Sequence, residues 1–355
     1  MDDEAGGSPG APRQPAVEGG WPRDGDGTMR AVWIDEFGGP EVLEVREVPR
    51  PRPGRGEVRV RVEAAGLNRA DLVQRQGKYP PPEGWPSRVP GLEYAGTVEA
   101  VGPGTGLRRV GEPVMGIAGG GGQAEYVVVP ERETIRIPEG MTREEAGGVP
   151  EVFMTAWDAL ERRLGLRSGE TVLIHAVGSG VGTAALQLAR VAGARTVGTA
   201  RDGAKLRRAG ELGLQHGVEG GSGWSDRVRD VTADRGVDAV LDLVGGVYLE
   251  ENQRALAPGG RHVVVGVPGG AQATIDLRRL MTTRATLVGT VLRARPPEEK
   301  AELARDFERR LVPHFEEGRL RPVVEWAASP EEIAEAHRAM EENRTFGKVV
   351  LSWED

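Results

Sequence analysis

The residues whose chemistry is easiest to interpret form a glycine-rich turn between an apolar run and a helical pattern. The apolar run covers Thr171 to Ala176, and the turn reads Ala176-Val177-Gly178-Ser179-Gly180-Val181-Gly182. Small residues let the backbone approach a pyrophosphate, whose charge is favourable at a helix N-terminus where amides lack partners. The spacing of a dinucleotide-binding fingerprint is met by Gly178, Gly180 and Thr183, or more loosely by Ala176, Ser179 and Gly182. A turn that binds no ligand is the alternative, and the strand–helix context favours the nucleotide.

The end of the next apolar run, 195–200, indicates which nucleotide binds. Enzymes that use NAD place an acid there, where it holds the ribose 2′-hydroxyl. Here Ala200 occupies that position, Arg201 follows it, and Lys205 lies one turn into the next helical pattern. A guanidinium pairs with a 2′-phosphate and gains nothing from a bare hydroxyl. The residues favour NADP; Asp202 leaves NAD open, and a solvated surface arginine is the other interpretation.

A parallel sheet is needed to position these residues, and the middle of the sequence predicts one. Short apolar runs alternate with helical patterns from Thr171 to about Leu292. The expected strands are 171–176, 195–200, 215–219, 237–244, 262–267 and 286–292, and the expected helices are 182–192, 204–212, 225–233 and 248–256. This alternation implies right-handed crossovers and therefore an α/β fold with a doubly wound parallel sheet.

The sequence on either side of this sheet has a different pattern. From Met29 to about Pro150, short β-rich runs are separated by turn clusters, which predicts a mostly β unit. Within it, Gly119 to Gly122 must form either a mobile loop or a very tight turn. After the sheet come an expected helix at 298–317, a strand at 323–327, a helix at 330–343 and a strand at 347–351. This ending could return to the first domain.

Composition limits the class of protein. The chain has 355 residues, of which 38% are hydrophobic, a net charge of -8 and no cysteine. Its length predicts two domains. No apolar run approaches the roughly 18 residues that span a bilayer, and no basic stripe indicates a nucleic-acid partner. The absence of cysteine excludes disulfides and cysteine-based zinc sites, and it fits a cytoplasmic location without proving it. Residues 1–28 are predicted to be a disordered leader, with Met29 as an alternative start.

Several stretches together resemble one family. They are Gly66 to Leu72, Gln76 to Pro80, His175 to Ala194, Leu292 to Arg295 and Phe346 to Leu351. They resemble the medium-chain dehydrogenase/reductase superfamily, specifically its zinc-free quinone oxidoreductase branch, which includes zeta-crystallin. The resemblance implies a GroES-like, mostly β catalytic domain built from 29–150 and 296–355. A Rossmann dinucleotide-binding domain, 151–295, is then inserted between the two parts, with the active site in the cleft.

The same resemblance implies that no metal is bound. Zinc alcohol dehydrogenases of the superfamily carry a Gly-His-Glu segment and a cysteine ligand, whereas this sequence has Gly91-Leu92-Glu93 at the matching place. Catalytic zinc prefers nitrogen and sulfur donors, so its ligand set cannot be assembled here. Glu93 is expected to be an interdomain hydrogen-bonding residue. The five histidines show no ligand spacing and are expected to be structural or surface residues.

The resemblance also assigns the site residues. It places Tyr79 and Asn68 near nicotinamide and substrate, where Tyr79 could donate a hydrogen bond to the developing oxyanion and Asn68 could orient the substrate or the ribose. A partly buried aromatic cap and a turn asparagine are the alternatives. The expected cofactor-binding residues are Thr155, Ser179, Gly180, Val181, Gly182, Arg201, Lys205, Gly245 and Gly266. One residue departs from the family pattern, because Gly220 stands where relatives often have a tyrosine that packs on the adenosine phosphate.

The implied activity is hydride transfer from NADPH to a quinone or an activated enone. A quinone spreads the developing negative charge and needs no metal, whereas a simple alcohol would need one. The nearest alternative is an enoyl or alkenal double-bond reductase, and an alternative of another class is a noncatalytic, crystallin-like NADPH-binding protein. The last strand of the parallel sheet is expected to pair across a two-fold axis and form a homodimer.

Overall fold

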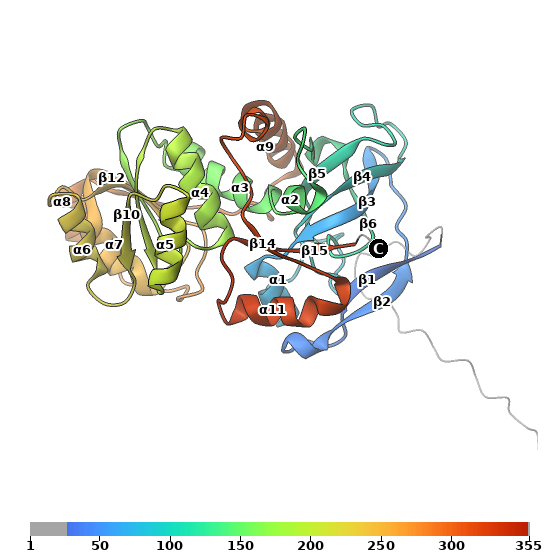
Figure 1. The fold of residues 1–355 in the computed structure, drawn as a ribbon, viewed down its shortest axis with the longest axis horizontal. Helices are drawn as coiled ribbons and strands as arrows, with labels where there is room; N and C mark the ends of the chain where they lie inside the picture. Colours follow the sequence, from blue (N-terminus) through green and yellow to red (C-terminus); the bar gives the residue numbers. More distant parts are fainter. Residues whose placement is uncertain (1–26, 354–355) are drawn as a thin grey trace, which may run out of the picture.

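A computed structural model describes residues 27–353, which contain two large sheets side by side (Figure 1). The strands are β1 (Thr28–Ile34), β2 (Leu43–Pro49), β3 (Glu57–Gly66), β4 (Glu93–Val101), β5 (Pro113–Ile117), β6 (Tyr126–Pro130), β7 (Thr134–Arg136), β8 (Thr171–Ile174), β9 (Arg195–Ala200), β10 (His216–Glu219), β11 (Val237–Asp242), β12 (Leu256–Val264), β13 (Thr286–Gly289), β14 (Val324–Ala328) and β15 (Lys348–Ser352).

The α-helices connect and cover these strands. They are α1 (Arg69–Arg75), α2 (Arg143–Gly147), α3 (Pro150–Trp157), α4 (Gly180–Val191), α5 (Gly203–Glu211), α6 (Trp224–Val231), α7 (Leu249–Ala255), α8 (Leu277–Thr283), α9 (Pro297–Arg310), α10 (Val312–Glu316) and α11 (Ile333–Glu341). A π-helical segment, η3 (Asp158–Arg163), extends α3, and short 3-10 turns are η1 (Pro40–Val42), η2 (Glu131–Glu133), η4 (Gly246–Tyr248) and η5 (Pro330–Glu332). None of the described helices is long and apolar enough to cross a membrane.

The first sheet is the doubly wound parallel sheet that the sequence predicts. Its order is β10-β9-β8-β11-β12-β13, and every neighbouring pair is parallel. All residues of β8 and β11 are buried, as expected for central strands with helices on both faces. The order reverses direction between β8 and β11. A crevice outside the carboxyl ends of these two strands is therefore where a ligand is expected.

The second sheet combines the two ends of the chain. Its order is β14-β15-β3-β4-β5-β7, with β6 also paired to β3. The late strand β15 runs antiparallel to the early strand β3, with Val350 opposite Gly66. Figure 1 shows β14 and β15, in red, against the blue and green strands of this sheet. The sheet of the GroES-like domain is therefore completed by strands from the C-terminal segment.

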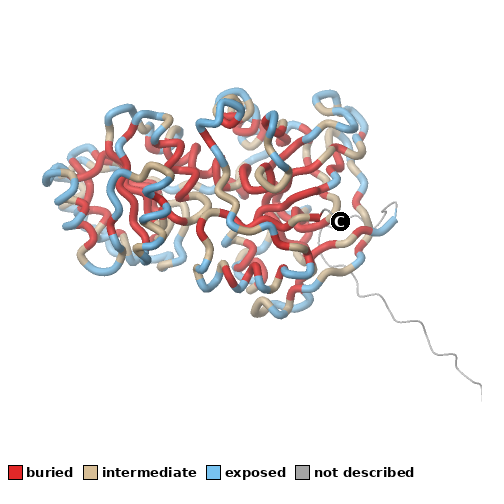
Figure 2. Tube along the Cα trace, viewed as in Figure 1, coloured by how far each residue is buried: buried red, intermediate tan, exposed pale blue. Residues whose placement is uncertain are grey.

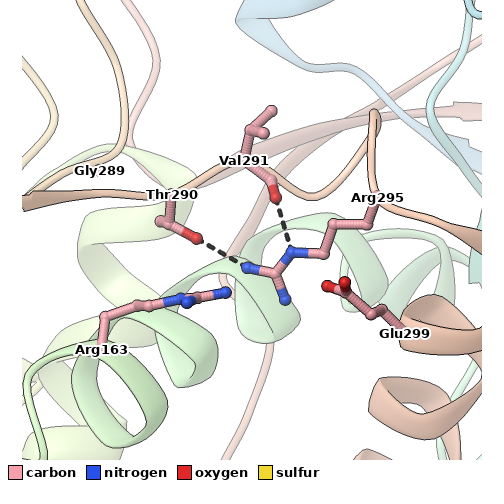
Figure 3. A pocket seen from close by; sticks show the side chains of 6 residues that line it. All are labelled: Arg163, Gly289, Thr290, Val291, Arg295 and Glu299. Atoms are coloured by element: carbon pink, nitrogen blue, oxygen red, sulfur yellow. Dashed lines mark hydrogen bonds between the residues drawn. The ribbon is translucent and has the colours of Figure 1, made fainter.

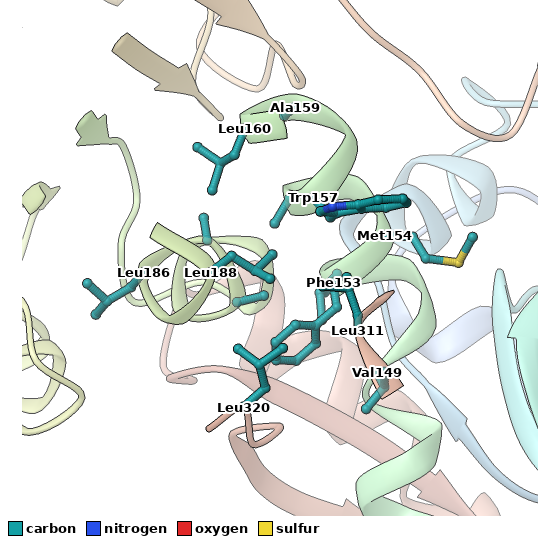
Figure 4. Packing of buried hydrophobic residues seen from close by; sticks show 14 of the residues in the cluster. Val149, Phe153, Met154, Trp157, Ala159, Leu160, Leu186, Leu188, Leu311 and Leu320 are labelled. Atoms are coloured by element: carbon teal, nitrogen blue, oxygen red, sulfur yellow. The ribbon is translucent and has the colours of Figure 1, made fainter. Parts of the chain in front are cut away.

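Helix α3 lies between the two sheets and is fixed by a shared core. Its apolar residues pack with α4 and the segment after α9 around Phe153, Trp157, Leu186, Leu188 and Leu311 (Figure 4). The Phe153 and Phe315 rings meet edge to face with centroids 4.8 Å apart. Figure 2 shows buried residues along the strands of both sheets. Because close-packed interiors resist displacement, α3 holds its first turn in a fixed position between the two domains.

The structure adds detail where the sequence left elements undefined. The helices α1, α2, α3 and α8 and the segment η3 were not predicted, and the expected helix at 298–317 is divided at Leu311, because Pro313 has no N–H to continue it. The run Gly119 to Gly122 is a buried bend, in which a Cβ on Gly119 would lie 2.5 Å from the Trp85 ring. The expected leader, 1–28, lies outside the described residues except for Gly27 and Thr28, where β1 begins. The domain limits remain predictions.

Candidate active site

The glycine-rich turn joins β8 to α4 and presents unpartnered amides. Ser179 is the N-cap of α4, and its Oγ accepts a hydrogen bond from the Gly182 amide at 3.1 Å. The amides of Gly180 and Val181 have no acceptor among the described residues, as expected for the first turn of a helix. A Cβ on Gly182 would lie 2.4 Å from the Ala176 carbonyl oxygen, so only glycine permits this close approach. The turn fits a pyrophosphate group.

Two further glycines lie at the same edge of the sheet. Gly245 follows β11 with a φ of 87°, and Gly266 follows β12. A Cβ on Gly245 would lie 2.8 Å from the Val267 Cα, so the two loops touch there. The expected positions of both glycines under the cofactor agree with this placement at the carboxyl ends of the central strands.

A buried polar network holds the loop that contains Gly245. Asp242 Oδ1 accepts hydrogen bonds from the amides of Val244 and Gly245, both at 2.8 Å. Its Oδ2 bonds to Asn252, which in turn bonds to His175 at 2.7 Å. Burial lowers the pKa of His175 to about 4, so this ring is neutral at pH 7. The histidine is structural, and the network fixes the loop that would lie beneath the cofactor.

The two residues expected to distinguish NADP from NAD, Arg201 and Lys205, differ in their hydrogen bonds to the rest of the protein. Arg201 is exposed and makes no hydrogen bond or ion pair with another described residue. Lys205, in contrast, donates through Nζ to the carbonyl oxygens of Asn343 and Thr345 at 2.6 and 2.8 Å. Burial and then the charge of Arg201 lower the pKa of Lys205. Lys205 therefore ties α5 to the C-terminal segment, and Arg201 is the cation with free donors.

Tyr248 occupies the space left open by Gly220. The Tyr248 hydroxyl lies 2.8 Å from the position of a Cβ on Gly220, so a larger residue at 220 would collide with it. The ring of Tyr248 packs edge to face against His175 at 4.8 Å. Relatives often carry a tyrosine at the position of Gly220, after β10. In this protein Tyr248, from the turn after β11, fills the same space. Tyr248 was not predicted, because positions 220 and 248 are not related by any local sequence pattern.

A buried ion pair lies beside Asn68. Lys348 Nζ bonds to Glu93 Oε1 at 2.6 Å, and the two side chains are 4% and 0% exposed. The same Nζ donates to Asn68 Oδ1 at 2.8 Å, and Asn68 Nδ2 donates to Glu93 Oε1 at 2.9 Å. Glu93 Oε2 accepts from the Glu151 backbone amide at 2.8 Å. Glu93 therefore joins α3, β15 and Asn68, in keeping with its expected interdomain role.

Tyr79 is held by an arginine from the other domain. The Arg293 guanidinium carbon lies 4.7 Å from the centre of the Tyr79 ring, a cation–π contact. Arg293 Nη2 also donates to Gln74 Oε1 at 2.9 Å and to the Gly119 carbonyl oxygen at 2.6 Å. Arg293 is 6% exposed, and burial lowers its pKa. It packs on the Tyr79 ring and was part of the family resemblance without an assigned role.

Two carboxyl groups near these residues have raised pKa values. Burial raises the pKa of Asp71 to about 6, although it accepts hydrogen bonds from the amides of Asn68 and Gly91. Burial and then the charge of Glu93 raise the pKa of Glu151 to about 8. Thr155, also expected at the cofactor, lies one helical turn after Glu151 on α3 and is buried. Such perturbed carboxyl groups cluster at functional sites. Glu151 could not be recognised as a site residue from the sequence, because it lies in an apolar segment.

The donor set does not fit a catalytic zinc ion. Leu92 is buried where the zinc enzymes have histidine, and the sequence contains no cysteine. Glu93 beside it is already paired with Lys348. Among residues 27–353, no group of three or more histidine or acidic side chains is arranged to hold a metal.

An open hollow of about 410 Å³ lies apart from these residues (Figure 3). It is lined by Arg163, Gly289, Thr290, Val291, Arg295 and Glu299. Arg295 donates to the Val291 carbonyl oxygen and to Thr290 Oγ1, and it also pairs with the buried Asp158. None of the expected site residues lines this hollow, so it is not the candidate active site.

Comparison with known families matches both parts of the chain. Residues 54–139 match the alcohol dehydrogenase GroES-like domain, and residues 180–309 match the zinc-binding dehydrogenase family. Quinone oxidoreductase of Homo sapiens is 31% identical over 335 residues, which cover 92% of this chain and 98% of that protein. The synaptic vesicle membrane protein VAT-1 homolog of Mus musculus is 32% identical over 342 residues, which cover 91% and 83%.

Solved structures give the same result. A NAD-dependent alcohol dehydrogenase is 37% identical with a TM-score of 0.82 and covers 92% of this chain and 100% of its own. A Pseudomonas syringae quinone oxidoreductase is 27% identical with a TM-score of 0.82, and CurK enoyl reductase is 27% identical with a TM-score of 0.80. Both cover 91% of this chain and 99% of their own.

The parallel sheet, the GroES-like domain and these similarities define a medium-chain dehydrogenase/reductase, an oxidoreductase class that uses a nicotinamide cofactor. Within that superfamily, the chain belongs to the quinone oxidoreductase branch.

Proposed function

We propose that the protein reduces quinones, or similarly activated enones, with hydride from NADPH and without a metal ion. The observation that carries this proposal is the residue at the matching zinc-ligand position, which is the buried, apolar Leu92. Tyr79 and Asn68 would then polarise and orient the substrate by hydrogen bonds in place of a Lewis acid. A quinone is reduced readily under such conditions because its ring delocalises the added charge.

The preference for NADPH rests on the cations around Arg201. Burial and then the charge of Arg201 lower the pKa of Arg69, just as they lower that of Lys205. Three cations close enough to disfavour one another provide a site that a 2′-phosphate would neutralise. The Tyr248 hydroxyl beside Gly220 adds a donor at the same place. One similar solved structure is named a NAD-dependent alcohol dehydrogenase, so both cofactors belong in the test.

The chain's own residues have separate tasks in this reaction. Bound NADPH would supply the hydride. Tyr79 would donate its hydroxyl proton in a hydrogen bond to the substrate oxygen as negative charge develops there, which is worth about 2–4 kcal/mol for a well-placed donor. Both Asn68 Nδ2 hydrogens are taken by Gly66 and Glu93, while Oδ1 keeps one lone pair beside its bond from Lys348. Asn68 would therefore accept from a ribose or substrate hydroxyl and orient it.

An enoyl or alkenal reductase is the second candidate function. It requires the same cofactor site and hydride donor, and the similar CurK structure is named an enoyl reductase. The two candidates differ in the shape of the acceptor rather than in the residues described above.

We further propose a homodimer formed through β13 and α8. No residue of either element is buried, although β13 is the last strand of a parallel sheet whose central strands are wholly buried. Leu277 and Met281 are 66% and 75% exposed. A second copy that continues the sheet would cover these apolar side chains and the free strand edge. We also place the enzyme in the cytoplasm, which cell fractionation tests.

A substrate panel tests the proposed function. Purified protein is mixed with ortho- and para-quinones, 2-alkenals and enoyl thioesters, each with NADPH and with NADH, and cofactor oxidation is followed. Fastest turnover with quinones and NADPH is expected. Faster reduction of alkenals or thioesters favours the double-bond reductase. A protein that binds NADPH but reduces no acceptor would be a noncatalytic nucleotide-binding protein, which contradicts the proposal.

A further inference from the structure

We propose that the side chain of Glu151 is the proton donor of this site, a role that rests on the hydride transfer proposed above. Hydride addition leaves negative charge on the substrate oxygen, and the reaction is complete only when that oxygen gains a proton. An acid near the residues that orient the substrate would supply this proton within the site instead of leaving it to solvent.

The position of Glu151 meets this requirement. It stands in the first turn of α3, and its amide donates to Glu93 Oε2 at 2.8 Å, while Glu93 Oε1 accepts from Asn68 Nδ2 at 2.9 Å. One carboxylate thus connects Glu151 with Asn68. Thr155 lies four residues later on the same helix face, and both residues are expected to face the cofactor side of the cleft.

Glu151 also differs from its acidic neighbours in having an uncommitted side chain. The Glu93 carboxylate accepts bonds from Lys348, Asn68 and the Glu151 amide. The Asp71 carboxylate accepts from the amides of Asn68 and Gly91 and from Gln123. The Glu151 carboxyl group has no hydrogen bond or ion pair with another described residue, although the residue as a whole keeps some exposed surface. It alone of the three is free to reach a ligand.

The surroundings of Glu151 keep a proton on it at neutral pH. The charged groups that face it are Glu93 from β4, Lys348 from β15, Asp71 from α1 and Arg293 from the loop after β13. Burial raises its pKa most, Glu93 and Asp71 raise it further, and Lys348 and Arg293 oppose them. The result is a pKa of about 8. A carboxylic acid that is neutral at pH 7 and can release its proton is suited to general acid catalysis.

Proton transfer from Glu151 would complete the reduction. An acceptor that has gained a hydride, with its two electrons and one hydrogen, is a hydroquinone monoanion or an enolate. The O–H bond of Glu151 then breaks, and an O–H bond forms on the substrate oxygen or a C–H bond forms on the enolate carbon. The Glu151 carboxylate that remains takes a proton from solvent before the next turnover.

The test compares Glu151→Gln, which keeps the shape but has no acidic proton, with Glu151→Asp and with the exposed control Glu302→Gln on α9. For the parent protein, kcat should be constant below pH 8 and fall about tenfold per pH unit above it. Glu151→Gln should lower kcat about 100-fold or more and abolish this fall, while Glu151→Asp restores part of the rate. NADPH affinity and the control should be unchanged.

A second measurement does not depend on activity. Between pH 4.5 and 8 the folded protein binds more protons at Glu151 than the unfolded chain does, so this residue makes stability fall as pH rises through that window. Glu151→Gln lacks this contribution. Its melting temperature relative to the parent should therefore be higher at pH 9 than at pH 5.

The outcomes separate this inference from the proposed function. A parent protein that reduces no acceptor overturns both. A parent that turns over while Glu151→Gln keeps its rate, or keeps the fall above pH 8, overturns the role of Glu151 alone. An equal melting difference at pH 5 and pH 9 shows that Glu151 holds no proton at neutral pH and also overturns it.

Discussion

Replacement of Lys348 by Met should destabilise the GroES-like domain, because it leaves Glu93 charged and buried. Lys348 uses all three of its ammonium hydrogens, on Glu93, Asn68 and the Leu67 carbonyl oxygen, at 2.6, 2.8 and 2.5 Å. Methionine keeps the apolar stem that packs against Gly180 and removes only the charged end. The measured effect therefore reports on the charge and its hydrogen bonds.

The expected loss follows from the burial of the pair. The two side chains are 4% and 0% exposed, so solvent cannot replace the missing partner. Removal of one member of such a pair costs about 3–5 kcal/mol, largely because the other charge is left uncompensated. At about 2 °C per kcal/mol for a chain of this size, the melting temperature should fall by roughly 6–10 °C.

Calorimetry and urea unfolding followed by tryptophan fluorescence measure this loss. Arg254→Met is the matched control, since it breaks an exposed pair with Glu250 and should cost less than about 0.5 kcal/mol. The double variant Lys348→Met with Glu93→Gln should recover at least about 2 kcal/mol, because no buried charge remains. A loss below about 1 kcal/mol for Lys348→Met, or no recovery in the double variant, would refute this reasoning.

Five other changes test the remaining parts of the site and the fold. Tyr79→Phe should lower kcat about 100-fold with NADPH affinity unchanged, and Asn68→Ala should also slow turnover; equal rates in steady-state assays would remove either residue from the mechanism. Arg201→Asp should reduce the preference for NADPH over NADH at least about tenfold in kcat/KM, since it removes a charge-assisted hydrogen bond, and an unchanged ratio would contradict the NADP assignment. Burial and the charge of Arg75 lower the pKa of His337 to about 3, so the folded state binds fewer protons than the unfolded chain below pH 6.5 and stability falls as pH falls. His337→Leu should flatten this decline in a series of melting curves, and an unaltered slope would assign the decline to other groups. Met281→Glu should convert a dimer into a monomer in light scattering, and a monomeric parent protein would contradict the proposed interface.

The sequence predicted the parallel sheet well, because buried strands and amphipathic helices differ in period and the glycine turn marks the first crossover. It did not predict α3, since Val152, Phe153, Met154, Ala156 and Trp157 are all buried and a helix that is apolar all round shows no periodic face. The same property concealed Glu151.

The site was predictable only where a motif marks it. The glycine turn and Arg201 could be located from local pattern, and Tyr79 and Asn68 from the family resemblance. The partners of these residues could not. Lys348 reaches Glu93 across 255 positions of the chain, and Tyr248 fills the place of Gly220 from a different strand connection. Both are products of tertiary packing, which no local pattern encodes.

The pairing of β3 with β15 has a consequence for the order in which the molecule is built on the ribosome. Strands β8 to β13 are contiguous and can form their sheet as soon as they emerge, whereas β3 must wait for a strand made much later. Glu93 on the neighbouring strand β4 likewise waits for Lys348 on β15. The two residues are 255 positions apart, so synthesis at about 5–20 residues per second makes this wait roughly 13–50 s. During that time an unpaired strand edge and an unneutralised carboxylate remain open to solvent or to a chaperone. The parallel sheet is thus able to fold before the GroES-like domain is complete.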